Sequence, residues 1–220
     1  MLGLDLARVK RDLELVPLIG SVSLERVLPR TLRIRVTERE AVAQTNVPRA
    51  RSPGGVEVAV FHLDAEGHVM VPLDRRQRTT PLNHANEALP VLTSVKYAEI
   101  QPGQRVESAQ VRAALRLVEA FACSPMAGLV DLQSIDVGSS EVLVVKTAQG
   151  SEVTFGLNDL ERQLRRWREV HDEGQRLGLN LATMDLAVTN SVPARWLEAS
   201  ALPVPPAKAP KTLRNRKRNV

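Results

Sequence analysis

The stretch that decides the fold is Val22-Ser23-Leu24-Glu25-Arg26-Val27-Leu28-Pro29-Arg30-Thr31-Leu32-Arg33-Ile34-Arg35-Val36. Apolar and polar residues alternate along both of its halves, and Leu28-Pro29-Arg30-Thr31 between them has the composition of a turn. Alternation of period two is typical of a strand with one buried face, and two such runs joined by a short turn predict a β-hairpin. We expect the first strand of this hairpin to begin at Ile19.

A helix is expected immediately before the hairpin. Asp5 is placed to cap its first turn, and Pro17 ends it because proline lacks the N–H group that a helix interior needs. The apolar residues of this segment recur at helical spacing, at Leu4, Leu6, Val9, Leu13 and Val16.

Behind the hairpin, residues 44–55 contain two prolines and two adjacent glycines, which predicts a connector. Two helices are expected later, one from about Ser108 and one from Asn158 to Gly178, where Asn158 and Glu161 have the spacing of a capping box. Trp167 and Cys123 are expected in the core. Strands are expected at residues 56–63, 69–71, 130–137, 141–147, 151–155 and 179–188, with a last extended piece at 192–196. The pattern predicts a two-domain α+β protein whose second part is mainly antiparallel sheet with two helices.

The net charge of +5 belongs to the end of the chain. No acidic residue follows Glu198, whereas six of the 30 Lys and Arg residues do, so the rest of the chain is close to neutral. Proline and charge leave residues 199–220 too little apolar content to form a core, and we expect a disordered basic tail there. Weak binding of this tail to anionic lipid or to nucleic acid is the alternative.

The sequence has no recognisable catalytic or metal motif. Its four histidines, His62, His68, His84 and His171, have no second ligand at a spacing typical of zinc. A Gly-x-Ser-x-Gly elbow and a glycine-rich phosphate loop are both absent from the sequence. We therefore expect no enzyme, no cofactor and no metal. The alternative is an active site built from carboxylates that converge only in three dimensions, namely Asp131, Asp136, Asp159 and Asp185.

Motifs on both sides of the hairpin extend the pattern. Leu4-Asp5-Leu6, followed by Val9, Leu13 and Val16-Pro17-Leu18-Ile19, leads into it, and Glu38-Arg39-Glu40-Ala41-Val42-Ala43 follows it. In this order the segments resemble the second helix, the next two strands and the Glu-Arg-x-Pro-Val-Ala ending of the POTRA domain in the FtsQ/DivIB family of bacterial division proteins. Glu40-Ala41 departs from that ending at the proline.

The resemblance continues to about residue 198, through the β domain of the same family. Ala187 and Val188 replace the Arg-Tyr pair that is usual there. The matching segments, in chain order, are Leu63-Asp64-Ala65-Glu66-Gly67, Leu89-Pro90-Val91-Leu92-Thr93, Val153-Thr154-Phe155-Gly156, Met184-Asp185-Leu186 and Trp196.

The resemblance implies a division of the chain into parts. The family's cytoplasmic tail, membrane helix, first POTRA strand and first POTRA helix would all precede Met1, so we expect this sequence to be N-terminally truncated or to start further upstream. A partial POTRA domain, a helix plus a hairpin with an exposed apolar face, is therefore expected at residues 1–48. The β domain is expected at residues 49–198, followed by the tail at 199–220.

The resemblance also implies a function. The family acts as a non-catalytic scaffold of the divisome, at the septum, and binds division proteins of the FtsB and FtsL type and the septal peptidoglycan synthase machinery. This part would lie on the periplasmic side of the bacterial inner membrane, attached through a single-pass anchor absent from this chain, and nucleic acid is not expected as a partner. The alternative is another POTRA-type interaction module, serving outer-membrane assembly or secretion.

A binding site is expected near the end of the second domain. Residues 185–196 should form the last strand segments and end at a sheet edge, where a partner strand satisfies unpaired backbone groups. The family uses this end of its sheet for a division partner. The residues expected to bind the partner are Ala187, Val188, Asn190, Arg195 and Trp196.

Overall fold

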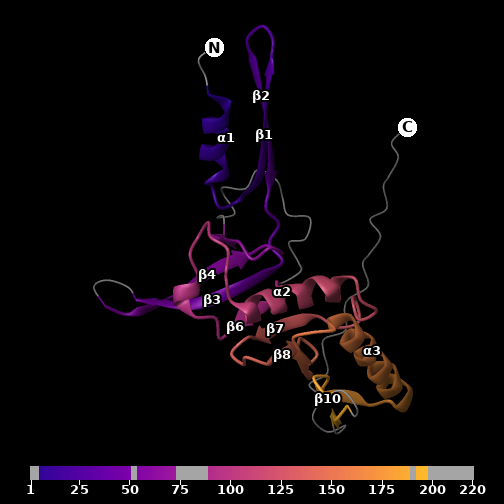
Figure 1. Ribbon diagram of the computed structural model, residues 1–220. Helices are drawn as coiled ribbons and strands as arrows, with labels where there is room; N and C mark the ends of the chain where they lie inside the picture. Colours follow the sequence, from indigo (N-terminus) through magenta and orange to yellow (C-terminus); the bar gives the residue numbers. More distant parts are fainter. Residues whose placement is uncertain (1–4, 51–53, 73–88, 189–191, 198–220) are drawn as a thin grey trace, which may run out of the picture.

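The computed structural model describes residues 5–50, 54–72, 89–188 and 192–197, so the tail expected from residue 199 lies outside the described residues. The described chain forms a two-stranded sheet beside one helix and a nine-stranded sheet covered by two helices (Figure 1). This confirms the α+β class. The helices are α1 (Leu6–Glu14), α2 (Ala109–Ala122) and α3 (Leu160–Leu177), with a short 3-10 helix η2 (Tyr97–Glu99). The strands are β1 (Ile19–Val27), β2 (Thr31–Glu38), β3 (Ala43–Ala50), β4 (Val56–Leu63), β5 (Val69–Met70), β6 (Val91–Thr93), β7 (Leu132–Asp136), β8 (Val142–Thr147), β9 (Glu152–Gly156), β10 (Asn180–Asp185) and β11 (Ala194–Leu197).

The first helix and the hairpin form where the sequence predicts them. Asp5 Oδ1 accepts hydrogen bonds from the N–H groups of Ala7 and Arg8, at 2.9 and 3.2 Å, and so caps α1. β1 and β2 pair antiparallel around the expected turn at residues 28–31. Figure 1 shows this hairpin rising from the rest of the molecule with α1 alongside it.

The hairpin has one apolar face, of which α1 covers only half. Val22 lies opposite Val36 and Leu24 lies opposite Ile34, so all four side chains share this face. Val22, on the strand next to α1, is buried, but Ile34 and Val36 are 48% and 46% exposed. The expectation of an exposed apolar face in this part of the chain is therefore confirmed.

The nine-stranded sheet has the order β11-β10-β9-β8-β7-β6-β3-β4-β5. Its pairs are antiparallel except at β10–β9, β3–β6 and β6–β7, which confirms a mainly antiparallel sheet. The parallel pairs at β6 join the hairpin β3–β4 to the meander β7–β8–β9. The sheet is thus continuous from residue 43 to residue 197, although its strands come from distant parts of the sequence.

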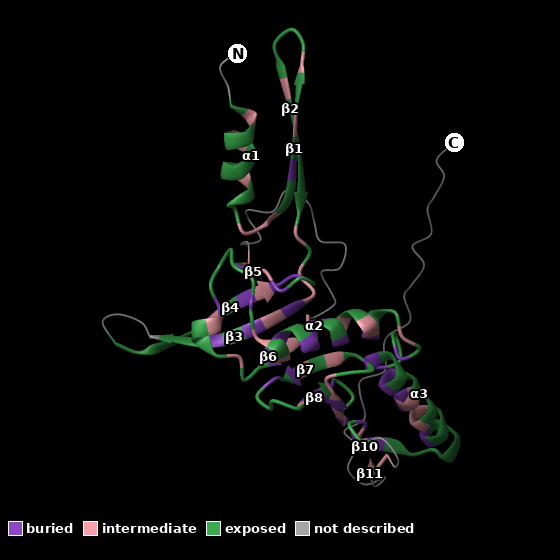
Figure 2. Cartoon of the chain, in the orientation of Figure 1, coloured by how far each residue is buried: buried purple, intermediate pink, exposed green. Residues whose placement is uncertain are grey.

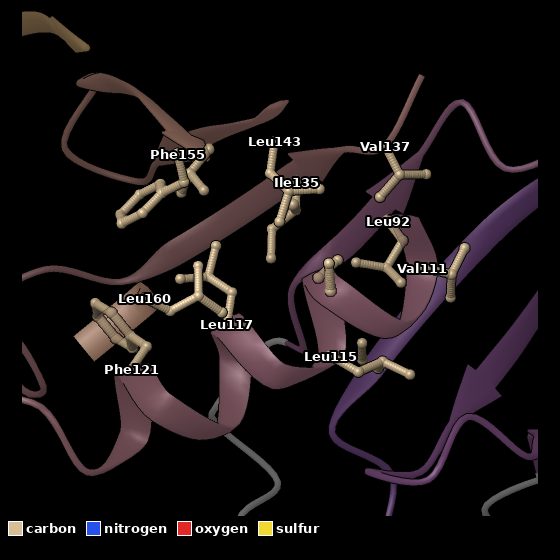
Figure 3. Packing of buried hydrophobic residues seen from close by; sticks show 14 of the residues in the cluster. Leu92, Val111, Leu115, Leu117, Phe121, Ile135, Val137, Leu143, Phe155 and Leu160 are labelled. Carbon is tan, nitrogen blue, oxygen red and sulfur yellow. The ribbon is translucent and has the colours of Figure 1, made fainter. Parts of the chain in front are cut away.

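One face of this sheet is packed against α2 and α3. Leu117 and Phe121 of α2 and Leu160 of α3 point toward Ile135 and Phe155 of the strands (Figure 3). Trp167 is 1% exposed, as predicted from its helical position, and its ring lies 5.8 Å from Phe155 and 6.0 Å from Phe121. Aromatic pairs at these distances stabilise a core beyond the area they bury. These contacts fix α3 on the sheet.

The two ends of α3 follow different rules. Gly178 ends it as predicted, in the left-handed conformation, and the Leu179 N–H donates to the Gly174 carbonyl at 2.8 Å. The predicted capping box is wrong, because Asp159 stands at the N-cap with a positive φ and no side-chain cap bond. Gln163 holds this end instead. Its Oε1 accepts from the Gly156 N–H at 2.9 Å, which ties the first turn of α3 to β9.

The connector expected at residues 44–55 is a strand over much of its length. Ala43, Thr45 and Val47 are buried at alternate positions of β3, which is the burial pattern of a strand and not of a loop. The Gln44 N–H donates to the Pro90 carbonyl beside β6, and so points away from β4. Because backbone groups alternate in direction along a strand, those of Pro48, four residues later, also point away from β4. Because no hydrogen bond to β4 is required from residue 48, a proline, which has no N–H group, is tolerated there.

The boundary expected after residue 48 falls inside this strand, and the two sheets separate between Glu38 and Ala43.

A partly buried ion pair joins the two sheets. The Arg39 N–H donates to the Leu18 carbonyl at 2.8 Å, which keeps Arg39 with the first hairpin. Its Nη1 reaches the turn after β4, 2.8 Å from Asp64 Oδ2 and 3.0 Å from His68 Nδ1. Asp64 is 3% exposed, and its carboxylate accepts from Arg39 and, at 2.7 Å, from the His68 N–H, so its charge depends on these donors.

We predict that Arg39→Met lowers the free energy of unfolding by about 3 kcal/mol, because it leaves the Asp64 carboxylate buried without its cation. Urea unfolding of both proteins measures the difference. Arg33→Met is the matched control: the Arg33–Glu25 pair is 3.0 Å long, but its side chains are 51% and 59% exposed. Its loss should cost about 0.5 kcal/mol. Equal losses for the two variants would contradict a structural role for Arg39.

Candidate protein-binding edge

The last two strands form one end of the nine-stranded sheet. After Gly178 the chain enters β10, which pairs parallel with β9 and antiparallel with β11. Asp185 ends β10, because its Oδ1 accepts from the Ala187 N–H at 2.9 Å and turns the chain. The strand expected over residues 179–188 is therefore shorter, and β11 follows as the outermost strand.

The hydrogen bonds around β10 show which backbone groups of β11 face outward. The Leu186 N–H donates to Thr154 beside β9, whereas the Asp185 N–H donates to the Pro193 carbonyl beside β11. Since neighbouring residues of a strand point their N–H and C=O groups to opposite sides, Pro193 and Arg195 face β10. Ala194 and Trp196 then direct theirs away from it. Within the described ranges, no strand pairs with β11 on that side.

The opposite end of the sheet is covered. Val69 of β5 donates to the Gln104 carbonyl and accepts from the Gly103 N–H, each at 2.9 Å. The Val106 N–H donates to Gly67 at 2.9 Å and extends this cover. A covered edge cannot accept another strand, so among the described residues β11 is the end of the sheet that stays accessible.

Trp196 packs inward although its backbone faces out. A Cβ added at Gly174 would lie 2.9 Å from Trp196 Cη2 and still closer to Cζ3, so the indole rests directly on the backbone of α3. Gly174 is buried, and it is the residue that sequence reasoning missed. A glycine within an otherwise helical pattern was the available signal, because it often marks a close approach.

The other residues expected at the site lie around this anchor. Arg195 is exposed in β11, beside Trp196. Ala187 and Val188 are exposed in the connection after β10 rather than in a strand, and the Val188 carbonyl accepts from Arg166 Nη1 at 3.1 Å. Asn190 lies outside the described residues. Ala194, whose outward amide the sequence did not single out, joins them.

The carboxylates considered for catalysis are kept apart. Asp136 and Asp185 lie in one row across the sheet, with β8 and β9 between them. At the far end of β7, the Asp131 carboxylate pairs with the Gln149 amide at 3.4 Å. Asp159 stands at the start of α3. The structure therefore does not assemble the four into one site.

Asp64, Glu66 and His68 are close enough to share a cation. However, the Arg39 guanidinium already contacts both the Asp64 carboxylate and the His68 ring. A metal ion there would have to displace a buried positive charge. The arrangement fits an ion-pair joint between the two sheets.

An open groove of about 880 Å³ lies between α2 and α3, and Cys123 lines it. This cysteine is exposed, so the expectation of a core position is wrong: α2 ends there and turns its last residues outward. A nucleophilic cysteine needs a base within hydrogen-bond reach, and among the described side chains none bonds to Cys123.

On the outer face of α3, a hydrogen bond from Arg168 holds the pKa of the Asp172 carboxyl below its ordinary value.

Comparison with known proteins adds the family. Residues 1–39 match the model of the FtsQ-type POTRA domain. Cell division protein FtsQ of Syntrophotalea carbinolica is 26% identical over 193 residues, which are 86% of this chain and 61% of that protein. Cell division protein FtsQ of Geotalea daltonii is 24% identical over 194 residues, or 87% of this chain and 64% of that protein. The POTRA match and the two FtsQ alignments together support the FtsQ/DivIB family for this chain.

The alignments show how much of each protein is similar. The chain spans about three fifths of the length of these FtsQ relatives, and they in turn align with most of its own length. The match to the FtsQ-type POTRA domain ends at Arg39, which is also the residue that joins the two sheets. None of the helices in the described part combines the length and apolar character needed to cross a bilayer.

We predict that Gly174→Ala destabilises this FtsQ-family chain by about 1–3 kcal/mol, because the new methyl group displaces the Trp196 ring. The usual effect of this change inside a helix is a gain of about 1 kcal/mol. Thermal and urea unfolding measure the sign. In a Trp196→Ala background the same change should become neutral or stabilising, and a destabilisation that persists there would mean that the indole is not the obstacle.

Proposed function

We propose that this protein is a non-catalytic scaffold of cell division, which binds other division proteins through its POTRA part and through the open edge at β11. The observation that carries the proposal is the outward direction of the Ala194 and Trp196 backbone groups at the uncovered end of the sheet. Family membership supplies the process, since both relatives are named as cell division proteins.

The chemistry of the edge favours an extended peptide. Outward N–H and C=O groups bind a partner strand through main-chain hydrogen bonds, and side chains beside the edge supply specificity. Exposed Arg195 in β11 and the 43% exposed Val188 offer a charge and an apolar contact. Trp196 acts indirectly, because its ring on Gly174 fixes the position of β11.

The proposal extends to partners and location. The partners are division proteins of the FtsB and FtsL type, together with the septal peptidoglycan synthase machinery. The protein acts at the septum on the periplasmic side of the inner membrane, held by a single-pass membrane anchor. Two functional parts, a POTRA part that ends between Glu38 and Ala43 and a β domain that begins with β3, divide the contacts between them. Binding between proteins requires no catalytic group.

We predict that Ala194→Pro weakens binding to the periplasmic region of an FtsB-type partner by about tenfold or more, or about 1.4 kcal/mol, because it removes one outward N–H group. Its melting temperature should stay close to that of the parent, since this N–H does not bond to β10. Biolayer interferometry against the immobilised partner, with a melting curve, tests both.

The control for this experiment is Val58→Pro, in the exposed part of β4 near the other end of the sheet. It makes the same chemical change and should leave partner binding unaltered. If Ala194→Pro folds normally and binds as tightly as the parent, β11 does not receive the partner. If both proline variants weaken binding equally, the effect is not specific to this edge.

A further inference from the structure

A second apolar surface lies on the hairpin β3–β4. Val56, Val58 and Val60 of β4 are 76%, 65% and 39% exposed, at alternate positions and therefore on one face. Figure 1 shows the hairpin extending sideways from the sheet, and its outer part is exposed in Figure 2. A row of exposed valines on a strand is unusual for a surface that stays in water.

The backbone of β4 is also open along this row. The Leu63 carbonyl accepts from Val42 on the β3 side, whereas the Asp64 N–H donates to His68 on the β5 side. By alternation, the backbone groups of Val56, Val58 and Val60 point away from β3. β5 pairs only with His62 and Leu63, so in the described part of the chain nothing pairs with these three residues.

The two edges of the hairpin differ in what they accept. On β3 the outward position beyond β6 holds Pro48, which has no N–H to donate and blocks strand addition. On β4 the three valines keep both outward donors and acceptors. Only the β4 edge is therefore suited to another strand.

We propose that this edge binds a second copy of the chain, by antiparallel pairing of β4 with β4 about a two-fold axis at Val58. The sequence Val56-Glu57-Val58-Ala59-Val60 has valine at the same three places in both directions. An isologous interface requires such self-complementarity. In this register Val58 faces Val58 of the second copy and Val56 faces its Val60, so the valines of both copies form one continuous apolar row.

Charge and space favour the axis at Val58 over axes one residue away, at Glu57 or Ala59. An axis at Glu57 would set the two Glu57 carboxylates opposite each other, which is unfavourable across a strand pair. An axis at Ala59 would run Val56 against His62, whose outward side already pairs with Met70. With the axis at Val58, Glu57 faces Ala59 of the second copy and keeps Arg49 opposite it within its own hairpin.

The dimer should be weak. Three residues per strand bury much less than the ~1,200 Å² of a stable interface, so association depends on local concentration. The pairing uses an edge remote from β11 in the strand order, and it does not rest on the proposed function. A failure of either proposal leaves the other intact.

The first test is sedimentation velocity of the full chain from low micromolar to near-millimolar concentration. We expect a concentration-dependent monomer–dimer equilibrium, and Val58→Lys should weaken it about tenfold or more by placing two ammonium groups face to face. The matched control is Val36→Lys, at the 46% exposed valine of the first hairpin, which should dimerise like the parent. A parent that stays monomeric, or a dimer lost equally in both variants, overturns the proposal.

A second test reads the register and does not depend on the fold of Val58→Lys. Starting from Cys123→Ser, a Val58→Cys chain should form disulfide-linked dimers with itself on mild oxidation, because facing residues lie within disulfide reach. Val56→Cys and Val60→Cys chains should cross-link efficiently only when mixed with each other. Equal cross-linking of all three variants alone, or a stronger product from Val36→Cys, would contradict pairing about Val58.

Discussion

Burial of Trp167 between α3 and the sheet is the interaction on which the rest of the second domain depends. Its contacts with Phe121 and Phe155 join α2, α3 and β9 in one core, and an apolar cluster of this kind supplies most of the driving force for folding. With α3 fixed, Gly174 becomes the surface on which Trp196 rests. The outermost strand is thus held by a core that lies several residues away from the edge it presents.

The edges of the nine-stranded sheet differ in whether they can pair with another strand. A strand at the end of a sheet must be covered, blocked or used, because unpaired backbone groups attract other strands. The described part of the chain applies a different solution at each place: the segment 103–106 covers β5, Pro48 blocks β3, and no described residue pairs with the outer side of β11 or of residues 56–60 in β4. A scaffold works by presenting such edges, and a rigid sheet presents them in fixed directions.

The joint between the two sheets has a different physical basis. The partly buried Arg39–Asp64 pair connects the residue after the first hairpin to the turn after β4. Ion pairs are directional and depend on both partners, so they set orientation more than they add stability. The same guanidinium removes the option of a metal site at Asp64, Glu66 and His68.

Local rules in the sequence determined the first hairpin, the three helices, the Asp5 cap and the Gly178 stop, because period, caps and turn residues act within a few positions. They also carried the family resemblance. Only the tertiary structure decided the strand at Pro48, the hydrogen bond by which Gln163 ties α3 to β9, and the packing of Trp196 on Gly174. The strand at Pro48 depends on pairing with β4 and β6, and the position of Trp196 depends on α3, which are elements distant from these residues in the chain. Which backbone groups stay unpaired depends on the order of all the strands, and no local pattern encodes that order.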